Sequence, residues 1–356
     1  MTIRLWLLAI TLGLCPSPCL AQAGVKSDRH DLLFYLDDAG ARKPVKNVAD
    51  WDRRRRQILA NLQKVMGDLP HPEARVPLDI QRTEKVDLGD GLWRHKISYQ
   101  SEPGKRVPAY LFLPSHSKKK RPAVLCLHQT TNLGKGEPSG LGGNPNLHYA
   151  LHLAQRGYVT LAPDYPSFGE HAWDFKGKRA YASGTMKAIW DNIRAVDLLQ
   201  SLPEVDAARI GCIGHSLGGH NALFTAAFET RIAVIVSSCG FTTFLRDDMP
   251  SWTGPRYMPR IAAVYQNDPA RVPFDFPEIL GCLAPRPFLA CAALHDKDFD
   301  VRGVKECLAA ARPIYTLLGK ASHLDGYYPD SPHDFPKDAR TAAYAFLDKH
   351  LQKEQP

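Results

Sequence analysis

A single serine stands between glycines where an apolar strand changes into a helix, in the stretch RIGCIGHSLGGHNALF (residues 209–224). Ile210 to Ile213 is short, apolar and partly β-branched, which predicts a buried strand, and helix formers follow Ser216. A strand that enters a helix without a spacer needs a sharp turn with a strained residue at its apex. Gly214 and Gly218 leave room where a side chain would collide with the neighbouring backbone. This G-x-S-x-G pattern predicts an exposed nucleophilic serine.

Strands and helices alternate along most of the chain on both sides of this turn. Apolar segments at 122–128, 158–164, 210–213, 232–240 and 286–294 predict strands, RPIYTLLG (312–319) predicts the last strand, and 337–351 predicts the last helix. The alternation predicts a mostly parallel central sheet with helices on both faces. Since the carboxyl ends of such strands meet at one edge, we expect the serine's partners in the loops that leave that edge.

A serine hydroxyl needs a base within hydrogen-bond reach, and the base needs an orienting acid. His333, in SPHDFP, is the predicted base because it lies between the last strand and the last helix, and His323 is the alternative. Asp296 is the predicted acid, because it comes soonest after the strand 286–294 and is best placed to be held rigidly. Asp298 and Asp300 follow the same strand and are the alternatives.

Two further groups are expected around the serine. The backbone N–H of Leu217, at the start of the helix, would stabilise an oxyanion together with that of Thr130 or Gln129, in the loop after the strand VLCLH. A long glycine-rich loop follows, and it could frame a substrate pocket. The predicted polar contacts to substrate are Lys135, Glu137 and Glu170, with a structural role in fixing loops as the alternative for Glu170.

The chain divides into three predicted parts. Residues 1–23 resemble a secretory signal, with Arg4 before the apolar run Leu5 to Leu14 and an A-x-A cleavage pattern at the end. Residues 24–85 form an N-terminal helical extension with one clear helix near 50–67, and residues 86–356 form the catalytic domain. No later apolar run is long enough to span a membrane, so we expect a secreted or periplasmic protein that is free of the membrane once the signal is removed.

Charge and cysteine content narrow the function classes. The formal charge is +8, and Arg53 to Arg56 supply part of it on what we expect to be the solvated face of the helix near 50–67. The basic runs are not interleaved with aromatic residues, which argues against nucleic-acid binding. The six cysteines beyond the signal are expected to be mostly free buried thiols, with disulfides as the alternative. No pair of them has metal-site spacing, so no metal is predicted.

Five segments carry a resemblance to a known family: LHQTT, RGYVTLAPDYPSFGE, GHSLGG, APRPFLACAALHD and HDFP. Together they resemble the α/β-hydrolase superfamily, in particular its dienelactone-hydrolase and acetyl-xylan-esterase-like branch, over about residues 95–352. The resemblance implies an α/β-hydrolase fold, a triad in the chain order Ser, Asp, His, and no cofactor. His128-Gln129 stands where many relatives have His-Gly. Because the nucleophile is Ser216, a dienelactone hydrolase proper, which uses cysteine, is disfavoured.

These features predict a secreted serine hydrolase that cleaves carboxylic esters, including acyl groups on carbohydrate, through an acyl-enzyme. Trp252, Tyr257 and Tyr265, in an irregular insertion at 241–283, could stack on sugar rings or form a lid that packs on the core. The first alternative is a serine peptidase of prolyl-oligopeptidase type, although the residues before the catalytic domain are too few for the propeller that such enzymes usually carry. The second is a non-catalytic hydrolase-fold binding protein, which would be expected to lack a triad member.

Overall fold

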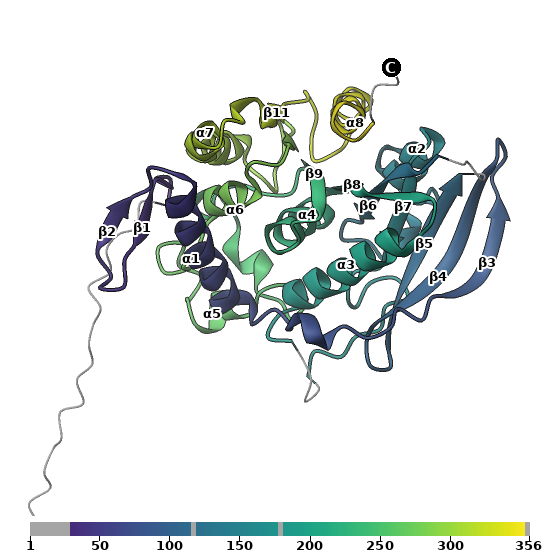
Figure 1. Ribbon diagram of the computed structural model, residues 1–356, viewed down its shortest axis with the longest axis horizontal. Helices are drawn as coiled ribbons and strands as arrows, with labels where there is room; N and C mark the ends of the chain where they lie inside the picture. Colours follow the sequence, from purple (N-terminus) through teal and green to yellow (C-terminus); the bar gives the residue numbers. More distant parts are fainter. Residues whose placement is uncertain (1–28, 115–118, 177–180, 353–356) are drawn as a thin grey trace, which may run out of the picture.

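The computed structural model describes residues 29–114, 119–176 and 181–352, and a nine-stranded sheet forms its centre (Figure 1). The strand order is β11-β10-β9-β8-β6-β7-β5-β4-β3. The six strands from β11 to β7 run parallel, while β5, β4 and β3 continue the sheet antiparallel. The bounds are β3 (Gln81–Asp87), β4 (Leu92–Glu102), β5 (Lys105–Pro114), β6 (Arg121–Leu127), β7 (Val159–Pro163), β8 (Val205–His215), β9 (Ile232–Ser238), β10 (Phe288–Cys291) and β11 (Leu324–Tyr327).

Helices cover both faces of this sheet. Helices α2 and α8 pack on one face, and α3, α4, α6 and α7 lie on the other, where α1 joins them (Figure 1). The bounds are α1 (Val48–Met66), α2 (Tyr149–Gln155), α3 (Gly184–Ser201), α4 (Leu217–Phe228), α5 (Arg260–Ala263), α6 (Phe276–Leu283), α7 (Val301–Leu317) and α8 (Lys337–Leu351). The predicted α/β-hydrolase architecture, a mostly parallel sheet covered on both faces, is confirmed.

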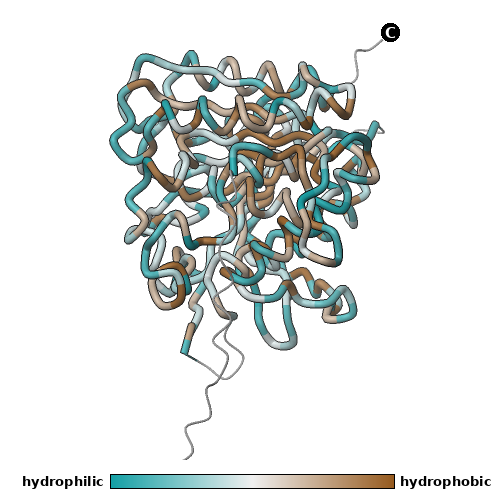
Figure 2. The backbone as a smooth tube through the Cα atoms, turned by 90° about the vertical axis from the view of Figure 1, so that its left-hand side faces the viewer, coloured by the Kyte–Doolittle hydropathy of each residue, from teal (hydrophilic) through white to brown (hydrophobic). Residues whose placement is uncertain are grey.

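The alternation of side chains along β6 shows how one strand serves two cores. Ala123, Leu125 and Leu127 belong to the buried cluster that faces α3 and α4, while Val124 and Cys126 belong to the cluster under α2 and α8. Successive side chains of a strand point to opposite faces, so a strand buried on both sides is apolar throughout. Figure 2 shows the result, with the hydrophobic segments gathered in the interior and hydrophilic ones in the outer loops.

The structure corrects the last predicted strand. Residues 312–317 continue helix α7, and the last strand is β11, four residues long and beginning at Leu324. The buried residues of α7 keep helical spacing from Val304 through Cys307 and Ala311 to Ile314. Pro313 lies inside this helix, although proline inside a helix is unfavourable. Similarly, β10 ends at Cys291, three residues before the predicted end of that strand at residue 294.

The N-terminal part contributes a hairpin, a helix and one strand of the main sheet. Strands β1 (Phe34–Leu36) and β2 (Arg42–Pro44) pair antiparallel beside α1, whose first turn is capped by Asn47. Strand β3 begins at Gln81 and pairs with β4, so the central sheet starts within the segment assigned to the extension. The division at residue 85 stays a prediction, and the expected signal at 1–23 lies outside the described residues.

Only half of the arginine run on α1 is the solvated face that we expected, since Arg53 and Arg56 are exposed and the other two are not. The Arg54 side chain is 5% exposed and donates to Glu278 of α6 at 2.5 Å. Arg55 donates to the carbonyls of Cys282 and Ala227, in the last turns of α6 and α4. Carbonyls at a helix C-terminus lack partners within the helix and attract cations. Arg54 and Arg55 therefore anchor α1 to helices α4 and α6. Their partners lie more than 170 residues away in the sequence, so composition does not reveal these contacts.

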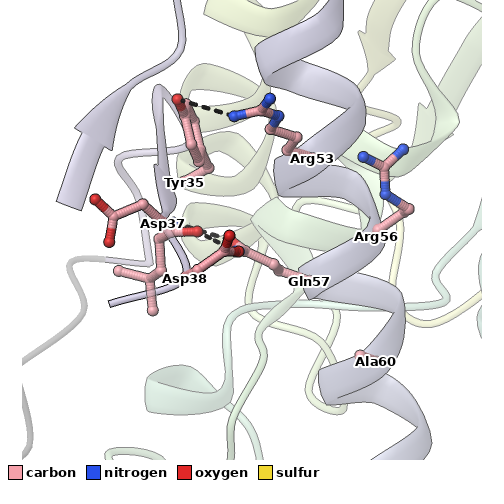
Figure 3. Close-up of a pocket in the computed structure, with 8 residues that line it drawn as sticks. Tyr35, Asp37, Asp38, Arg53, Arg56, Gln57 and Ala60 are labelled. Carbon is pink, nitrogen blue, oxygen red and sulfur yellow. Dashed lines mark hydrogen bonds between the residues drawn. The ribbon is translucent and has the colours of Figure 1, made fainter. Parts of the chain in front are cut away.

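The β1–β2 hairpin is held on the other side of α1, around a shallow pocket (Figure 3). Gln57 uses both ends of its amide, accepting from Leu36 N at 3.0 Å and donating to Leu36 O at 2.6 Å. Arg53 lies 3.5 Å from the hydroxyl of Tyr35. These contacts tie the hairpin to the helix.

Two expectations about the chain as a whole are met in the described part. Its six cysteines are all free and buried, as predicted. No helix found there is long and apolar enough to cross a membrane.

Candidate active site

Ser216 occupies the apex between β8 and α4 with φ 53° and ψ −121°, a backbone conformation that side chains other than glycine rarely adopt. The flanking glycines are required by contact. A Cβ on Gly214 would lie 2.3 Å from the backbone of Gly218, and one on Gly218 would lie 1.9 Å from the carbonyl oxygen of Leu127. The turn therefore has the strained geometry predicted for a nucleophile elbow.

His333 and Asp296 form a hydrogen-bonded pair. Asp296 Oδ2 and Oδ1 lie 2.9 Å and 3.0 Å from His333 Nδ1, and the Asp296 side chain is only 1% exposed. Burial would lower the pKa of His333, but its hydrogen bond to Asp296 and the charge of that carboxylate outweigh burial and raise it above the ordinary value. Burial likewise opposes the lowering of the Asp296 pKa, which the bond to His333 and two backbone N–H groups produce. Asp296 thus stabilises the imidazolium that forms when neutral His333 accepts the proton of the serine.

The sheet topology explains why these residues meet. Ser216 follows β8, Asp296 follows β10 and His333 follows β11, and these strands run parallel. All three therefore leave the sheet at its carboxyl edge. His323 precedes β11, at the opposite edge, where its Nδ1 lies 2.8 Å from the carbonyl of Pro285. The structure thus brings His333, and not the alternative His323, to the serine's edge.

The two alternative acids have other surroundings. Asp298 Oδ2 is 3.7 Å from His333 Nδ1, but its side chain is 68% exposed. Asp300 caps the N-terminus of α7 and pairs with Arg302. Asp296 alone of the three accepts a hydrogen bond from His333 and also accepts two from its own loop, from the N–H groups of Asp298 and Phe299.

His215, the residue before Ser216 in the elbow, packs against the histidine of the pair. The His215 ring lies 4.8 Å from that of His333, and its Nδ1 is 3.0 Å from Ser238 Oγ. Burial lowers the pKa of His215 to about 3, so it is neutral beside His333. Within the described residues, Ser216 Oγ and His333 form no hydrogen bond. Such catalytic contacts often tighten only when substrate binds.

A pocket of about 350 Å³ opens beside the serine. It is lined by Thr130, Ser216, Leu217, Arg246, Asp247, Asp248, Ser251, Trp252, Tyr257, Lys297, Asp298 and Phe299. Both predicted oxyanion positions, Leu217 and Thr130, thus share it with Ser216. Gln129 does not line it, and its side chain donates to Glu137 at 2.7 Å.

Among the pocket residues that sequence reasoning missed, Asp247 has the most enclosed carboxyl, and the other polar ones are Arg246, Asp248, Ser251 and Lys297. Burial raises the pKa of Asp247 to about 7, although Trp252 donates its indole N–H to the carboxylate at 2.9 Å. Nothing in the local sequence separates it from Asp248, because only the folding of the insertion decides which carboxyl turns inward. The same insertion brings Trp252 and Tyr257 to the pocket, with ring centroids 5.8 Å apart.

The predicted polar contacts to substrate lie elsewhere. Lys135 is buried, and its Nζ contacts Asp164 at 2.7 Å and Glu170 at 3.2 Å. Glu137 is buried too, accepting from Gln129 and from the N–H of Asn144. None of these residues lines the pocket at Ser216. Lys135 pairs with two carboxylates and Glu137 accepts two hydrogen bonds, so both side chains help to hold the glycine-rich loop, and Glu170 joins this network at Lys135. Their contact with substrate stays a prediction.

The fold also brings together three side chains of the kinds that can bind a metal ion, although the spacing of the cysteines in the sequence did not indicate this. Cys239 Sγ, a carboxylate oxygen of Asp296 and a ring nitrogen of His333 lie within 4.8 Å of one another. The hydrogen bond between Asp296 and His333 already accounts for two of the three, and burial raises the pKa of the Cys239 thiol, which keeps it protonated.

Comparison with known proteins places the chain in a family. A 4-O-methyl-glucuronoyl methylesterase 1 of Wolfiporia cocos is 25% identical over 371 aligned positions, 96% of this chain and 85% of that protein. The carbohydrate esterase MZ0003, from an unknown prokaryotic organism, is 25% identical over 335 positions, 77% of this chain and 76% of that protein. A glucuronoyl esterase structure from Solibacter usitatus shares the fold, with a TM-score of 0.70, 19% identity and coverage of 91% of this chain and 97% of that one. Residues 146–354, more than half of the chain, match the prolyl oligopeptidase family. The chain therefore belongs to the prolyl oligopeptidase family and is a serine hydrolase of the α/β-hydrolase superfamily.

Proposed function

We propose that the protein hydrolyses carboxylic esters of carbohydrates through a triad of Ser216, His333 and Asp296. The observation that carries the proposal is the contact of His333 with the buried carboxylate of Asp296, at 2.9 Å, on the sheet edge where the strained Ser216 stands. Ser216 without a base would be a weak nucleophile, and the pair supplies an oriented one.

The reaction follows from these positions in two steps. Ser216 Oγ bonds to the ester carbonyl carbon while His333 Nε2 takes the serine proton, and the N–H groups of Leu217 and the loop after β6 stabilise the oxyanion. The bond to the alcohol then breaks, and His333 returns the proton to the departing oxygen, leaving an acyl-enzyme. Water, deprotonated by His333, repeats the sequence and releases the acid. Asp296 keeps the proton on Nδ1 throughout, so that Nε2 stays free to accept.

The carbohydrate part of the proposal rests on the pocket and on the relatives. Tyr257 offers a ring face on which a sugar can stack, Trp252 lines the pocket beside it, and Asp247, Ser251 and Lys297 offer polar groups for the sugar hydroxyls. Two relatives similar along most of this chain are named a 4-O-methyl-glucuronoyl methylesterase and a carbohydrate esterase. An exported enzyme would meet such esters outside the cell, which agrees with the signal predicted at residues 1–23.

A peptidase activity is the second candidate, favoured by the family match itself. The same triad can attack an amide, so the choice depends on what the pocket accepts. An amide has a poorer leaving group than an ester, and its nitrogen must receive the proton from His333.

The test is a panel of substrates on the purified full chain: acetylated xylo-oligosaccharide, the methyl ester of a glucuronoside, simple acyl esters and peptide amides. We expect turnover of at least one carbohydrate ester at 10-fold or more the kcat/KM of its sugar-free counterpart. Ser216→Ala should lower that turnover by about 10⁴-fold or more with the fold intact, and a phosphonate probe should label Ser216 only in the wild type. Ser201→Ala is the control, since this serine ends α3 and does not line the pocket. Preference for peptide amides would replace the carbohydrate-ester proposal, and an active Ser216→Ala variant would overturn the triad.

A further inference from the structure

His128, in the loop after β6, uses one ring nitrogen to contact the loop after β7 and the other to contact its own loop. The side chain is buried, and its Nε2 lies 2.9 Å from the backbone N of Tyr165. Its Nδ1 lies 2.6 Å from the carbonyl oxygen of the next residue, Gln129. Neither contact involves substrate, and the triad does not use this histidine.

The partners of His128 determine where its proton sits. The N–H of Tyr165 can only donate, so Nε2 must be unprotonated to accept from it. The remaining proton is then on Nδ1, which donates to the carbonyl of Gln129. Burial lowers the pKa of His128, which agrees with a neutral ring in this arrangement.

That bond fixes the direction of the next peptide. In a trans peptide the C=O and the following N–H point in opposite directions. With the Gln129 carbonyl held on His128, the N–H of Thr130 points away from His128. Thr130 lines the pocket with Ser216 and Leu217, and within the described residues its N–H has no hydrogen-bond partner.

The other possible donor, the N–H of Gln129, is turned elsewhere. The carbonyl oxygen of His128 lies against the first turn of α4, 2.9 Å from where a Cβ of Gly218 would be. The N–H of Gln129 belongs to the same peptide and so points away from that turn, where Leu217 presents its own N–H.

We propose that His128 is a positioning residue that selects Thr130 N–H as the second oxyanion donor, by holding the carbonyl of Gln129. The inference rests on the proposed nucleophilic role of Ser216. It predicts that loss of the His128–Gln129 bond harms the transition state and leaves ground-state binding of the ester almost unchanged.

The experiment compares His128→Asn with His128→Gln. Asparagine places an amide nitrogen near the position of Nδ1, where it can still donate to Gln129, whereas glutamine reaches the position of Nε2 and can still accept from Tyr165. For each variant we would measure kcat per site titrated with a phosphonate, KM for the best ester, and Ki for a trifluoromethyl ketone bearing the same acyl group. The ketone forms a serine adduct whose oxyanion occupies the oxyanion site.

We expect His128→Gln to lower kcat by at least about 10-fold, towards the 10²–10³-fold that loss of one oxyanion donor causes. Its Ki should rise by a similar factor while KM stays within about 3-fold, and His128→Asn should keep most of the wild-type kcat. The control is His148→Gln, since His148 also bonds a carbonyl of the same long loop, Gly142 O at 3.0 Å, but on the exposed side. This control should leave all three constants unchanged.

Several results would overturn the inference. If His128→Gln keeps kcat and Ki, or if Asn is the more damaging substitution, the bond to Tyr165 matters and the bond to Gln129 does not. If both variants lose titratable sites without a change in kcat per site, His128 only stabilises the fold. These outcomes are distinct from failure of the triad, which would appear as an active Ser216→Ala variant.

Discussion

Replacement of Asp296 by asparagine tests the triad at its most sharply defined contact. Asp296 Oδ1 accepts the N–H groups of Asp298 and Phe299 at 2.8 Å and 3.0 Å. An asparagine carbonyl would keep those two bonds, so its NH₂ group would face His333 Nδ1 from the position of Oδ2. Because two donors cannot share a hydrogen bond, the proton of His333 would move to Nε2. His333 could then no longer accept the proton of Ser216.

The expected loss in turnover is large and mechanistically specific. A triad histidine in the wrong tautomer costs about 10⁴-fold in kcat in enzymes of this type, or roughly 5.5 kcal/mol of barrier. The fold should survive, since the side chain keeps its volume and its backbone bonds. Asp296→Asn should therefore give normal circular dichroism with very low turnover.

Asp298→Asn is the matched control in the same loop. Its carboxylate is 3.7 Å from His333 Nδ1 but largely exposed to water. Coulomb's law in a medium of ε ≈ 80 gives about 1 kcal/mol at that distance before salt screening, and exposed pairs usually contribute less. We expect a loss in kcat of no more than about 5-fold.

The assay is hydrolysis of the best ester from the panel, with kcat expressed per site titrated and folding checked by near-ultraviolet circular dichroism. If folded Asp296→Asn retains more than a tenth of the wild-type kcat, the tautomer argument fails. If Asp298→Asn is the severe variant, the exposed carboxylate orients His333 and the contact geometry has been misread.

Four further predictions concern the site and the anchoring of α1. His333→Ala should abolish turnover as fully as loss of the serine, while His323→Ala should leave kcat within about 2-fold; the reverse result in the ester assay would exchange their roles. His333 is neutral only when the pH exceeds its raised pKa, so kcat/KM should rise with pH through a midpoint above 6.5. A midpoint below 6.5 would contradict the raised pKa. Arg54→Met leaves a buried carboxylate unpaired and should lower the free energy of unfolding in urea by about 3–5 kcal/mol, whereas Arg56→Met should change it by under about 0.5 kcal/mol; equal effects would refute the anchoring role. Burial lowers the pKa of His220 to about 3, below the ordinary 6.5, so as pH falls the unfolded chain takes up this proton before the folded chain does. The free energy of unfolding should therefore fall as pH drops below 6.5, by up to about 1.4 kcal/mol per pH unit. His220→Phe should reduce this pH dependence in urea titrations at pH 7 and 5.

Local sequence determined the elbow. Gly214, Ser216 and Gly218 are close in the chain, and the steric demand that selects them acts within one turn, so the pattern predicts the strained apex that the structure has. The alternation of apolar strands and helices predicted the layers for a similar reason, because each segment carries its own periodicity. Because the carboxyl ends of parallel strands meet at one edge, the predicted layers also indicated the edge of the sheet where the partners of the serine lie.

The choice of Asp296 shows a prediction whose stated reason was incomplete. Asp296 was favoured over Asp298 and Asp300 for its short distance from a predicted strand end at residue 294, but β10 ends at Cys291. Asp296 contacts His333 because its loop turns back and holds the carboxylate with two backbone N–H groups. Its role in catalysis stays a prediction, resting now on that geometry.

Only the tertiary structure decided which charges are paired and which face the pocket. Lys135 meets Asp164 across 29 residues of sequence, and Arg54 meets Glu278 across 224. Asp247 lines the pocket beside Ser216 from an irregular insertion, which has no periodic pattern to indicate the direction of its side chains. A periodic pattern specifies the face of an element, but a contact between distant residues depends on how whole elements pack. For that reason the sequence by itself could name the nucleophile and the edge where its partners gather, while the identity of the residues that hold and line the site had to come from the fold.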